Sequence, residues 1–404
     1  GRVEGNPTPA PIASAGVIGA GQMGRGIAFA LARAGVEVKL VEQDGEQMAR
    51  AMRAVAEIAD REEARGGAKA ATTAGRIVAA SIKDLGDCDL VIEAIVEDMA
   101  VKQALFAELE SVVGDNAILA TNTSYLDINT MAEGLRDPSR VAGLHFFHPA
   151  HVMRLVEVVR TDRASPRVLA SLVALSRRMR KLPILARVDD GFVANQMFAA
   201  YRQQSEFLLQ EGAMPRDVDN AMLEFGMAMG PFAVADLAGL DIAWARRKRQ
   251  ATDRDPQARY VDVPDRLCEL GRFGRKTGRG WYDYRSNSAG ADDPETAALV
   301  LESASQAGIG RSEMDAETIT RRLLAAIVNT AADLIGRGTA ERQEDIDLAW
   351  AHGFGFPRLK GGPLHWARQQ EPERIMADVE HMVAASGKGF RVSPALEGLL
   401  SNPA

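Results

Sequence analysis

The sequence predicts a doubly wound α/β sheet followed by an all-α region, and two patterns carry this prediction. Between residues 15 and 187, short β-branched runs alternate with amphipathic segments of helical periodicity. That alternation is typical of βαβ units, which build a mostly parallel sheet. Beyond Asp190 and Gly191 the apolar spacing becomes helical, and no convincing strand run returns. We therefore expect two structural parts that meet near residue 188.

The strands expected in the first part are short aliphatic runs bounded by polar or glycine-containing segments. They occupy 16–18, 37–41, 89–92, 117–120, 141–144, 155–159 and 183–186. A helix is expected over 23–34, between the first two of these strands.

A glycine-rich turn joins the first expected strand to this helix. Gly19, Gly21 and Gly24 form a GxGxxG pattern, and the strand before it and the helix after it give the pattern its meaning. Such a turn lets a pyrophosphate approach the backbone N–H groups of a helix N-terminus, here the turn that also contains Gln22 and Met23. At the end of the second strand lies a carboxylate, that of Glu42, which would accept hydrogen bonds from ribose hydroxyls and repel a 2′-phosphate. These features predict NAD as the cofactor, with a ligand-free glycine turn as the alternative.

The helical part repeats itself. A helix over 196–212 is followed by a helical segment at 216–222, and the same order returns at 322–338 and 344–350. Two copies of one helical unit are expected to pack on each other, as the units of a two-fold dimer do. The expected division is a linker or expression remnant at 1–14, an NAD-binding Rossmann-type domain at 15–187, a first helical domain at 188–285, a linker at 286–294 and a second helical domain at 295–404.

Composition and charge exclude several classes of protein. The formal net charge of −7 argues against a nucleic-acid partner, which normally needs a basic face. No apolar run approaches the roughly 20 residues that span a bilayer. Cys88 and Cys268, the two cysteines, lie in no metal-type cluster, which favours a reducing compartment. Because neither a signal-peptide pattern nor a Ser-Lys-Leu type ending is found, a cytoplasmic location is expected, with a peroxisomal one as the alternative.

A histidine-rich segment and an isolated acid mark the candidate chemical site. His145, His148 and His151 are three of the six histidines, and Glu157 is the only acid in the apolar strand 155–159. A buried carboxylate is costly unless it is paired, and a histidine would satisfy it. Such a pair could take a proton from an alcohol as a hydride leaves, with the carboxylate fixing the imidazole tautomer. A structural ion pair is the alternative, and so is a metal site, which a spacing of three along an extended segment disfavours.

The segment GLHFFHPAHVMRLVEVV at 143–159 resembles the signature of the L-3-hydroxyacyl-CoA dehydrogenase family. It is most similar to the dehydrogenase part of multifunctional fatty-acid β-oxidation enzymes, and the resemblance covers essentially residues 15–375. It implies NAD-dependent oxidation of an L-3-hydroxyacyl-CoA to the 3-ketoacyl-CoA, with His145 as base and Glu157 as its partner. The segment ATNTS resembles a family loop that implies Ser124 at the substrate oxygen and Asn122 beside the cofactor.

Further matched segments imply further site residues. The segment DGFVAN resembles the entry to the family's helical domain and implies that Asn195 binds the substrate. The segment AIVEDMAVK implies that Glu97 and Lys102 line the cofactor, and RKTG implies the same of Lys276. His148 stands where many relatives carry an asparagine near the cofactor, so this contact departs from the family pattern.

The resemblance also implies partners. The substrate is expected to be an acyl-CoA, and an upstream hydratase domain or a separate hydratase or thiolase partner is expected, since multifunctional relatives contain a hydratase domain. A monomer or a homodimer is expected, because the second helical copy can replace the contact that dimeric relatives make between chains. Two other functions stay open: a dehydrogenase of another small β-hydroxy acid, which would use a lysine base, and a non-catalytic NAD-binding relative.

Overall fold

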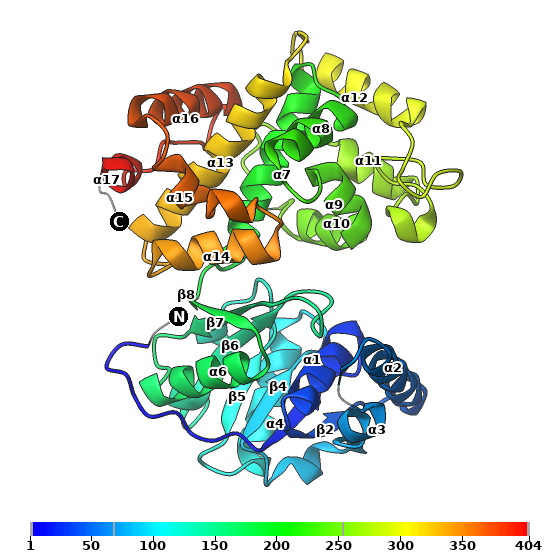
Figure 1. Cartoon of the computed structure of the whole chain (residues 1–404), viewed down its shortest axis with the longest axis vertical. Coiled ribbons are helices and arrows are strands. Elements are labelled where there is room, and N and C mark those ends of the chain that lie inside the picture. Colours follow the sequence, from blue (N-terminus) through cyan, green and yellow to red (C-terminus); the bar gives the residue numbers. More distant parts are fainter. Residues whose placement is uncertain (1–2, 68, 253, 402–404) are drawn as a thin grey trace. The chain divides into compact units, whose positions relative to one another are not determined.

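The computed structural model describes residues 3–67, 69–252 and 254–401. The expectations about a linker and about targeting signals rest partly on 1–2 and 402–404, which lie outside these residues. The chain forms two compact units (Figure 1). One contains the part up to Asn195 together with Gly338–Gly353, and the other contains Gln196–Arg337 together with the part from Phe354 onward. The chain thus returns once to the first unit, which differs from a division at a single boundary near residue 188.

An eight-stranded sheet forms the centre of the first unit. Its order is β3-β2-β1-β4-β5-β6-β7-β8, and all neighbours are parallel except β6 and β7. The strands are β1 (Ser14–Ile18), β2 (Glu37–Val41), β3 (Ile77–Ala80), β4 (Leu90–Glu93), β5 (Ile118–Thr121), β6 (Val141–Phe146), β7 (Leu155–Arg160) and β8 (Leu182–Arg187). The predicted α/β class is confirmed. Strand β3 was missed, because it is a four-residue edge strand with an exposed middle.

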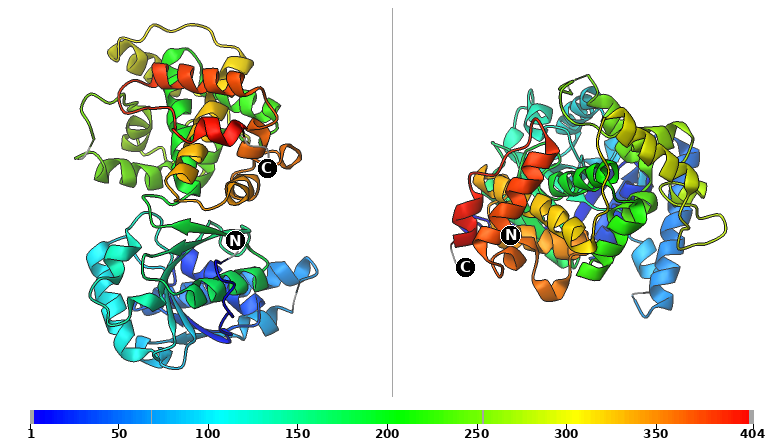
Figure 2. Two further views of the ribbon diagram at one scale, coloured as in Figure 1. Left: turned by 90° about the vertical axis from the view of Figure 1, so that its left-hand side faces the viewer. Right: turned by 90° about the horizontal axis from the view of Figure 1, so that it is seen from above.

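Helices cover both faces of this sheet (Figure 2). One apolar core joins α1, α2 and α6 to alternate residues of the strands, whereas α5 packs against β6 from the other side at Gly143. A late helix, α14, returns to pack on β7 and β8. These helices are α1 (Gln22–Arg33), α2 (Gly45–Ala64), α3 (Ala70–Ala74), α4 (Met99–Val112), α5 (Ile128–Ala132), α6 (Pro166–Arg178) and α14 (Gln343–Gly353), with short 3₁₀ helices η1 (Ile82–Leu85) and η2 (Pro138–Arg140).

The second unit is helical. Its long helix α13 contacts α8, α15, α16 and α17. In the ranges that the structure describes, this unit has isolated β-bridges but no strand, so the all-α expectation is confirmed. The elements are α7 (Ala194–Glu211), α8 (Pro215–Phe225), α9 (Pro231–Ala238), α10 (Leu240–Arg249), α11 (Val263–Glu269), η3 (Arg275–Thr277), α12 (Pro294–Gln306), α13 (Ala316–Gly336), η4 (Arg358–Lys360), α15 (Pro363–Ala367), α16 (Pro372–Ser386) and α17 (Leu396–Ser401). No helix among the described residues is both long and apolar enough to cross a membrane.

Corresponding turns of the two expected helical copies touch inside this unit. The N–H of Ala228, in the turn after α8, donates to the carbonyl oxygen of Gly355 at 3.1 Å. A Cβ on Gly226 would lie 3.1 Å from the ring of Pro357. The two turns therefore contact each other in the manner of units related by a two-fold axis.

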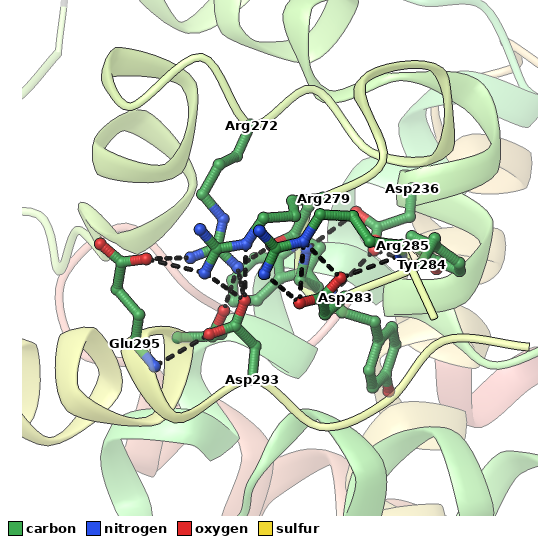
Figure 3. A network of polar contacts seen from close by, with 12 residues as sticks. Asp236, Arg272, Arg279, Asp283, Tyr284, Arg285, Asp293 and Glu295 are labelled. Atoms are coloured by element: carbon green, nitrogen blue, oxygen red, sulfur yellow. Dashed lines mark hydrogen bonds and ion pairs between the residues drawn. The ribbon is translucent and has the colours of Figure 1, made fainter. Parts of the chain in front are cut away.

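A polar network fastens the segment between α11 and α12 (Figure 3). The buried Arg272 donates to Asp293 at 2.6 Å, and Arg279 donates to the same carboxylate at 2.7 Å. The carboxylate of Asp236, on α9, accepts from the N–H groups of Trp281 and Tyr282 at 2.9 and 3.1 Å and from the hydroxyl of Tyr284 at 3.0 Å. This long loop is therefore held by charge-assisted bonds at several points.

Candidate active site

The antiparallel pairing of β6 with β7 brings the predicted base and its partner together. The ladder places His145 directly opposite Glu157, and the imidazole Nδ1 lies 2.7 Å from the carboxylate Oε2. Both side chains are buried, with 4% of His145 and 0% of Glu157 exposed. An ionised carboxylate can only accept, so Nδ1 carries the proton and the Nε2 lone pair is left to accept another.

The second oxygen of Glu157 binds the backbone that enters α7. Oε1 accepts hydrogen bonds from the N–H groups of Val193 at 3.1 Å and Ala194 at 3.0 Å. The turn that aims these groups contains two consecutive left-handed residues, Gly191 at φ 86° and Phe192 at φ 52°. A phenylalanine in this region is strained, and the surrounding contacts must hold it there. Both carboxylate oxygens are therefore fixed.

Ser124 continues this chain of polar contacts from the loop that follows β5. Its Oγ lies 3.2 Å from the Nε2 of His145. In the same loop, the Oδ1 of Asn122 accepts from the N–H of Phe146 at 2.8 Å. This bond ties the end of β5 to the end of β6, so the serine and the histidine are carried by connected backbone.

Two aromatic rings pack against the imidazole, and the predicted Asn195 follows the backbone that binds Glu157. The rings of Phe147 and Phe192 pack against His145, with centroids 4.6 and 5.6 Å from that of the imidazole. Asn195 lies in the first turn of α7, close to the left-handed turn at Gly191. The structure thus brings Ser124, His145 and Glu157 into one connected set and places Asn195 on the backbone that binds the glutamate.

Glu97 binds the loop that carries Ser124. Its Oε1 accepts from the Thr123 hydroxyl at 2.6 Å and from the N–H groups of Ser124 and Tyr125 at 3.0 and 3.2 Å. The other oxygen lies 3.4 Å from the Nζ of Lys102. Burial raises the pKa of Glu97, but these hydrogen bonds and the lysine outweigh burial, and the pKa lies below its ordinary value. Glu97 is therefore an ionised acceptor at neutral pH.

The glycine-rich turn has the geometry that a dinucleotide needs. Gly19 has φ 97°, and a Cβ at Gly24 would lie 1.7 Å from the carbonyl oxygen of Gly19. A Cβ on Gly21 would meet nothing within 4 Å, so this backbone borders open space. Gly21 is also the N-cap of α1, which has neither a side-chain cap nor an acidic residue in its first turn. The helix N-terminus is thus free to bind an anion.

Glu42 stands beside this turn at the end of β2. One of its oxygens accepts from the N–H of Ala20 at 3.1 Å, and the other accepts from Gln43 and Asp44 at 2.9 and 3.2 Å. These bonds hold the carboxylate against the glycine turn, at the position where a ribose would lie.

The other predicted cofactor residues of this unit lie around the start of α1. Gln22 is exposed, and Met23 packs partly buried against the sheet's core. His148 follows β6, where burial and then the charge of Arg25 lower its pKa. His148 is therefore neutral at physiological pH.

The remaining predicted residue, Lys276, lies in the second unit. Its Nζ pairs with a carboxylate oxygen of Asp241 at 2.5 Å. Among the described residues no three His, Cys, Asp or Glu side chains are placed to hold a metal ion, and the ring of His151 packs edge-on against Phe29.

Comparison with known proteins identifies the chain. Residues 14–189 match the family described as 3-hydroxyacyl-CoA dehydrogenase, NAD binding domain, and residues 191–284 match its C-terminal domain. The solved structure of FadB2 from M. tuberculosis is 36% identical, covers 68% of this chain and 100% of its own, and has a TM-score of 0.64. The chain belongs to the 3-hydroxyacyl-CoA dehydrogenase family. The predicted resemblance and the predicted NAD-binding domain are confirmed.

Two further members of the family match most of the chain. The 3-hydroxybutyryl-CoA dehydrogenase of Escherichia coli is 28% identical, with a TM-score of 0.82, and covers 96% of this chain and 98% of its own. The peroxisomal bifunctional enzyme of Cavia porcellus is 40% identical over 374 residues, which are 88% of this chain and 51% of that enzyme. The chain therefore spans about half the length of this curated relative.

Some residues of the site were not predicted from the sequence. The N–H groups of Val193 and Ala194 are backbone groups, so no side-chain pattern could reveal them. Glu93 was overlooked, although a carboxylate that ends a fully buried strand is a signal comparable to the one that identified Glu157.

Proposed function

We propose that the chain uses NAD to oxidise the hydroxyl group of a 3-hydroxyacyl-CoA, with His145 as the general base. The observation that carries this proposal is the connected set Ser124–His145–Glu157, joined by contacts of 3.2 and 2.7 Å. It lies at the carboxyl ends of β5 and β6, and ligands of such sheets bind at that edge. The glycine turn after β1 opens at the same edge.

The residues of the glycine turn fit an NAD molecule. Gly19 and Gly24 leave no room for a Cβ, Gly21 borders open space, and the N-terminus of α1 lacks a side-chain cap. These groups would hold the pyrophosphate, and Glu42 would bind the ribose hydroxyls. When bound, NAD supplies the acceptor for the hydride.

The proton is handled by residues of this chain. As the hydride leaves C3 of the substrate, the Nε2 lone pair of His145 accepts the hydroxyl proton and the substrate oxygen becomes a carbonyl. The Ser124 hydroxyl can donate to that oxygen, and Glu157 stabilises the imidazolium that forms. In the reverse direction the same imidazolium returns the proton.

Replacement of the base tests the proposal. His145→Gln should lower the reduction of acetoacetyl-CoA by NADH by about 10²- to 10⁴-fold, the usual contribution of a general base. NADH binding, followed by fluorescence, should stay unchanged, and His381→Gln at an exposed position serves as the control. Retained turnover in His145→Gln would refute the assignment of the base. A wild-type protein that binds NADH but turns over no acyl-CoA of any chain length would indicate a non-catalytic relative.

The finer features of the assembly are proposals as well. We propose a monomer, since corresponding turns of the two helical regions contact each other within one chain. Light scattering of the purified protein would show a dimer if this is wrong. We propose the cytoplasm as the compartment, although the curated relatives are named peroxisomal bifunctional enzymes. We also propose a hydratase as the partner. Imaging of a tagged full-length protein tests the compartment.

A further inference from the structure

We propose that Glu93, Lys102 and Glu97 form a positioning network that holds Ser124 for the reaction. The inference rests on the proposed function, because it assigns the network to the same hydroxyl-binding serine. We use the term positioning network for these three side chains alone. They act through the backbone of the loop after β5, on groups that would touch the substrate.

Glu93 is the anchor of the positioning network. It ends β4, is 0% exposed, and lies beside Thr121 in the parallel ladder with β5. Its Oε1 accepts from the Nζ of Lys102 at 2.6 Å and from the N–H of Ile95 at 2.7 Å. Its Oε2 accepts from the Thr121 hydroxyl at 2.6 Å. A fully buried carboxylate is thereby satisfied by a cation and two neutral donors.

Two routes lead from Glu93 to the Ser124 backbone. In the first, Lys102, which is 1% exposed, lies between Glu93 and Glu97, and Glu97 accepts from the Ser124 N–H. In the second, the Thr121 oxygen that bonds Glu93 also accepts from the N–H of Thr123 at 3.1 Å. The loop is therefore pinned on both sides of the serine, which lies 3.2 Å from the base.

The energetics favour a positioning role over a stabilising one. A buried ion pair rarely stabilises a fold more than an apolar pair of the same size, because desolvation offsets the Coulomb attraction. What such a pair does provide is a fixed geometry, since each charge must keep its partner. The positioning network applies this constraint at the loop whose placement decides where the Ser124 hydroxyl meets a substrate oxygen.

Replacement of Glu97 by glutamine would break this geometry without removing bulk. One side of the Glu97 carboxylate faces three donors of the loop, and the other side faces the Lys102 ammonium. A glutamine must direct its NH₂ group at one of these sets of donors, so one set loses its acceptor. The loop then shifts, and a shift of about 1 Å at a catalytic group can cost about 10²-fold in rate.

A double-mutant cycle tests the proposal. Glu97→Gln and Glu93→Gln should each lower kcat for acetoacetyl-CoA reduction by about 10-fold or more, and Ser124→Ala should lower it by about 10²-fold. The double variant Glu97→Gln/Ser124→Ala should be no slower than Ser124→Ala alone, because the serine that Glu97 positions is already absent. KM for acetoacetyl-CoA and the Kd for NADH should stay within about 3-fold, since the loss lies in the transition state.

The matched control is Glu110→Gln. Glu110 is also a buried carboxylate of this unit, and it accepts from the N–H groups of Arg136 and Asp137 at 2.9 and 3.1 Å and pairs with Arg140. It lies near the C-terminal end of α4, and the residues that it binds come just before β6, at the opposite edge of the sheet from Ser124. Its replacement should lower the melting temperature while kcat stays within about twofold, because a general loss of stability does not move the serine.

Three outcomes would overturn the proposal. In one, the fold losses of kcat caused by Glu97→Gln and by Ser124→Ala multiply fully in the double variant. Another is weaker NADH binding at unchanged kcat, which would make Glu97 a cofactor ligand and not a positioning residue. The third is an equal loss of kcat in Glu110→Gln. Failure of the proposed function gives a different result: either the wild type is inactive with every acyl-CoA, or His145→Gln keeps its activity.

Discussion

Glutamine at position 157 should disable the base while leaving the fold in place. In Glu157→Gln the side chain keeps one oxygen, and both original oxygens are in use, one at His145 and one at the N–H groups of Val193 and Ala194. If the remaining oxygen faces the two N–H groups, the NH₂ donates to Nδ1 of the imidazole. Nε2 then carries the proton and cannot accept another. This orientation is preferred, because the reverse one leaves two buried N–H groups unpaired.

The size of the effect follows from these two orientations. Reaction from the reversed orientation costs about 1 to 3 kcal/mol for each unpaired buried N–H, or about 2 to 6 kcal/mol in total. At 1.36 kcal/mol per tenfold change, this corresponds to a loss of about 30-fold to 10⁴-fold in kcat. The upper end agrees with the loss of about 10⁴ known for a base held in the wrong tautomer.

The assay compares kcat for acetoacetyl-CoA reduction, the Kd for NADH and the melting temperature in Glu157→Gln, Glu110→Gln and the wild type. We expect the loss in kcat only for Glu157→Gln, with NADH binding unchanged in both variants. A Glu157→Gln enzyme that keeps more than a tenth of the wild-type kcat would refute the tautomer argument. A change confined to KM would do the same, since it would make Glu157 a substrate-binding group.

Three other perturbations give measurable results. Gly24→Ala should lower the melting temperature, because its Cβ would lie 1.7 Å from a carbonyl oxygen. Gly21→Ala places its Cβ in open space, so this variant should melt like the wild type but bind NADH at least about tenfold more weakly. Equal melting temperatures and equal NADH binding in the two variants would contradict the turn geometry. Asp293→Ala removes the nearer of the two carboxylates that the buried Arg272 binds and leaves only Glu295, at 3.2 Å, so it should cost up to about 3 to 5 kcal/mol in denaturant unfolding. An unchanged midpoint would show that the Arg272–Asp293 pair contributes nothing. Burial raises the pKa of Asp236 from 3.8 to about 6, although hydrogen bonds oppose the shift. Because the folded pKa exceeds the unfolded one, this contribution to stability is present below pH 4 and is lost as pH rises through about 6, by up to about 3 kcal/mol. The difference in melting temperature between wild type and Asp236→Asn should change over that range, and a constant difference would disprove the shift.

The fold was largely readable from the sequence because strands and helices have different apolar periods. The prediction failed at β3, whose residues Val78 and Ala79 are exposed and give no period-two pattern of burial. It also did not place Gly338–Gly353 in the first unit. A helix covering a sheet and a helix in a bundle bury the same kind of apolar stripe, so periodicity alone cannot assign the partner.

The candidate site was predictable where a side chain was out of place for its surroundings. Glu157 in an apolar strand pointed to His145, and the structure shows the pair in contact. Residues whose contribution is a backbone N–H, such as Ala194, leave no such mark. Glu97 shows a different limit: the resemblance implied a place beside the cofactor, while its hydrogen bonds to the serine loop became visible only in three dimensions.

Because of the ladder between β6 and β7, the distance between His145 and Glu157 does not depend on the length of the loop that joins these strands. Because His145 and Glu157 are opposite partners in an antiparallel pair, their spacing is set by backbone hydrogen bonds and not by residues 147–154. Beyond Phe147, whose ring packs on His145, that connection can therefore lengthen or shorten without moving the pair apart. A slip of one residue within either strand would instead turn one partner to the opposite face of the sheet. An insertion in the loop is thus tolerated, whereas an insertion a few residues away, within β6 or β7, would disrupt the pair.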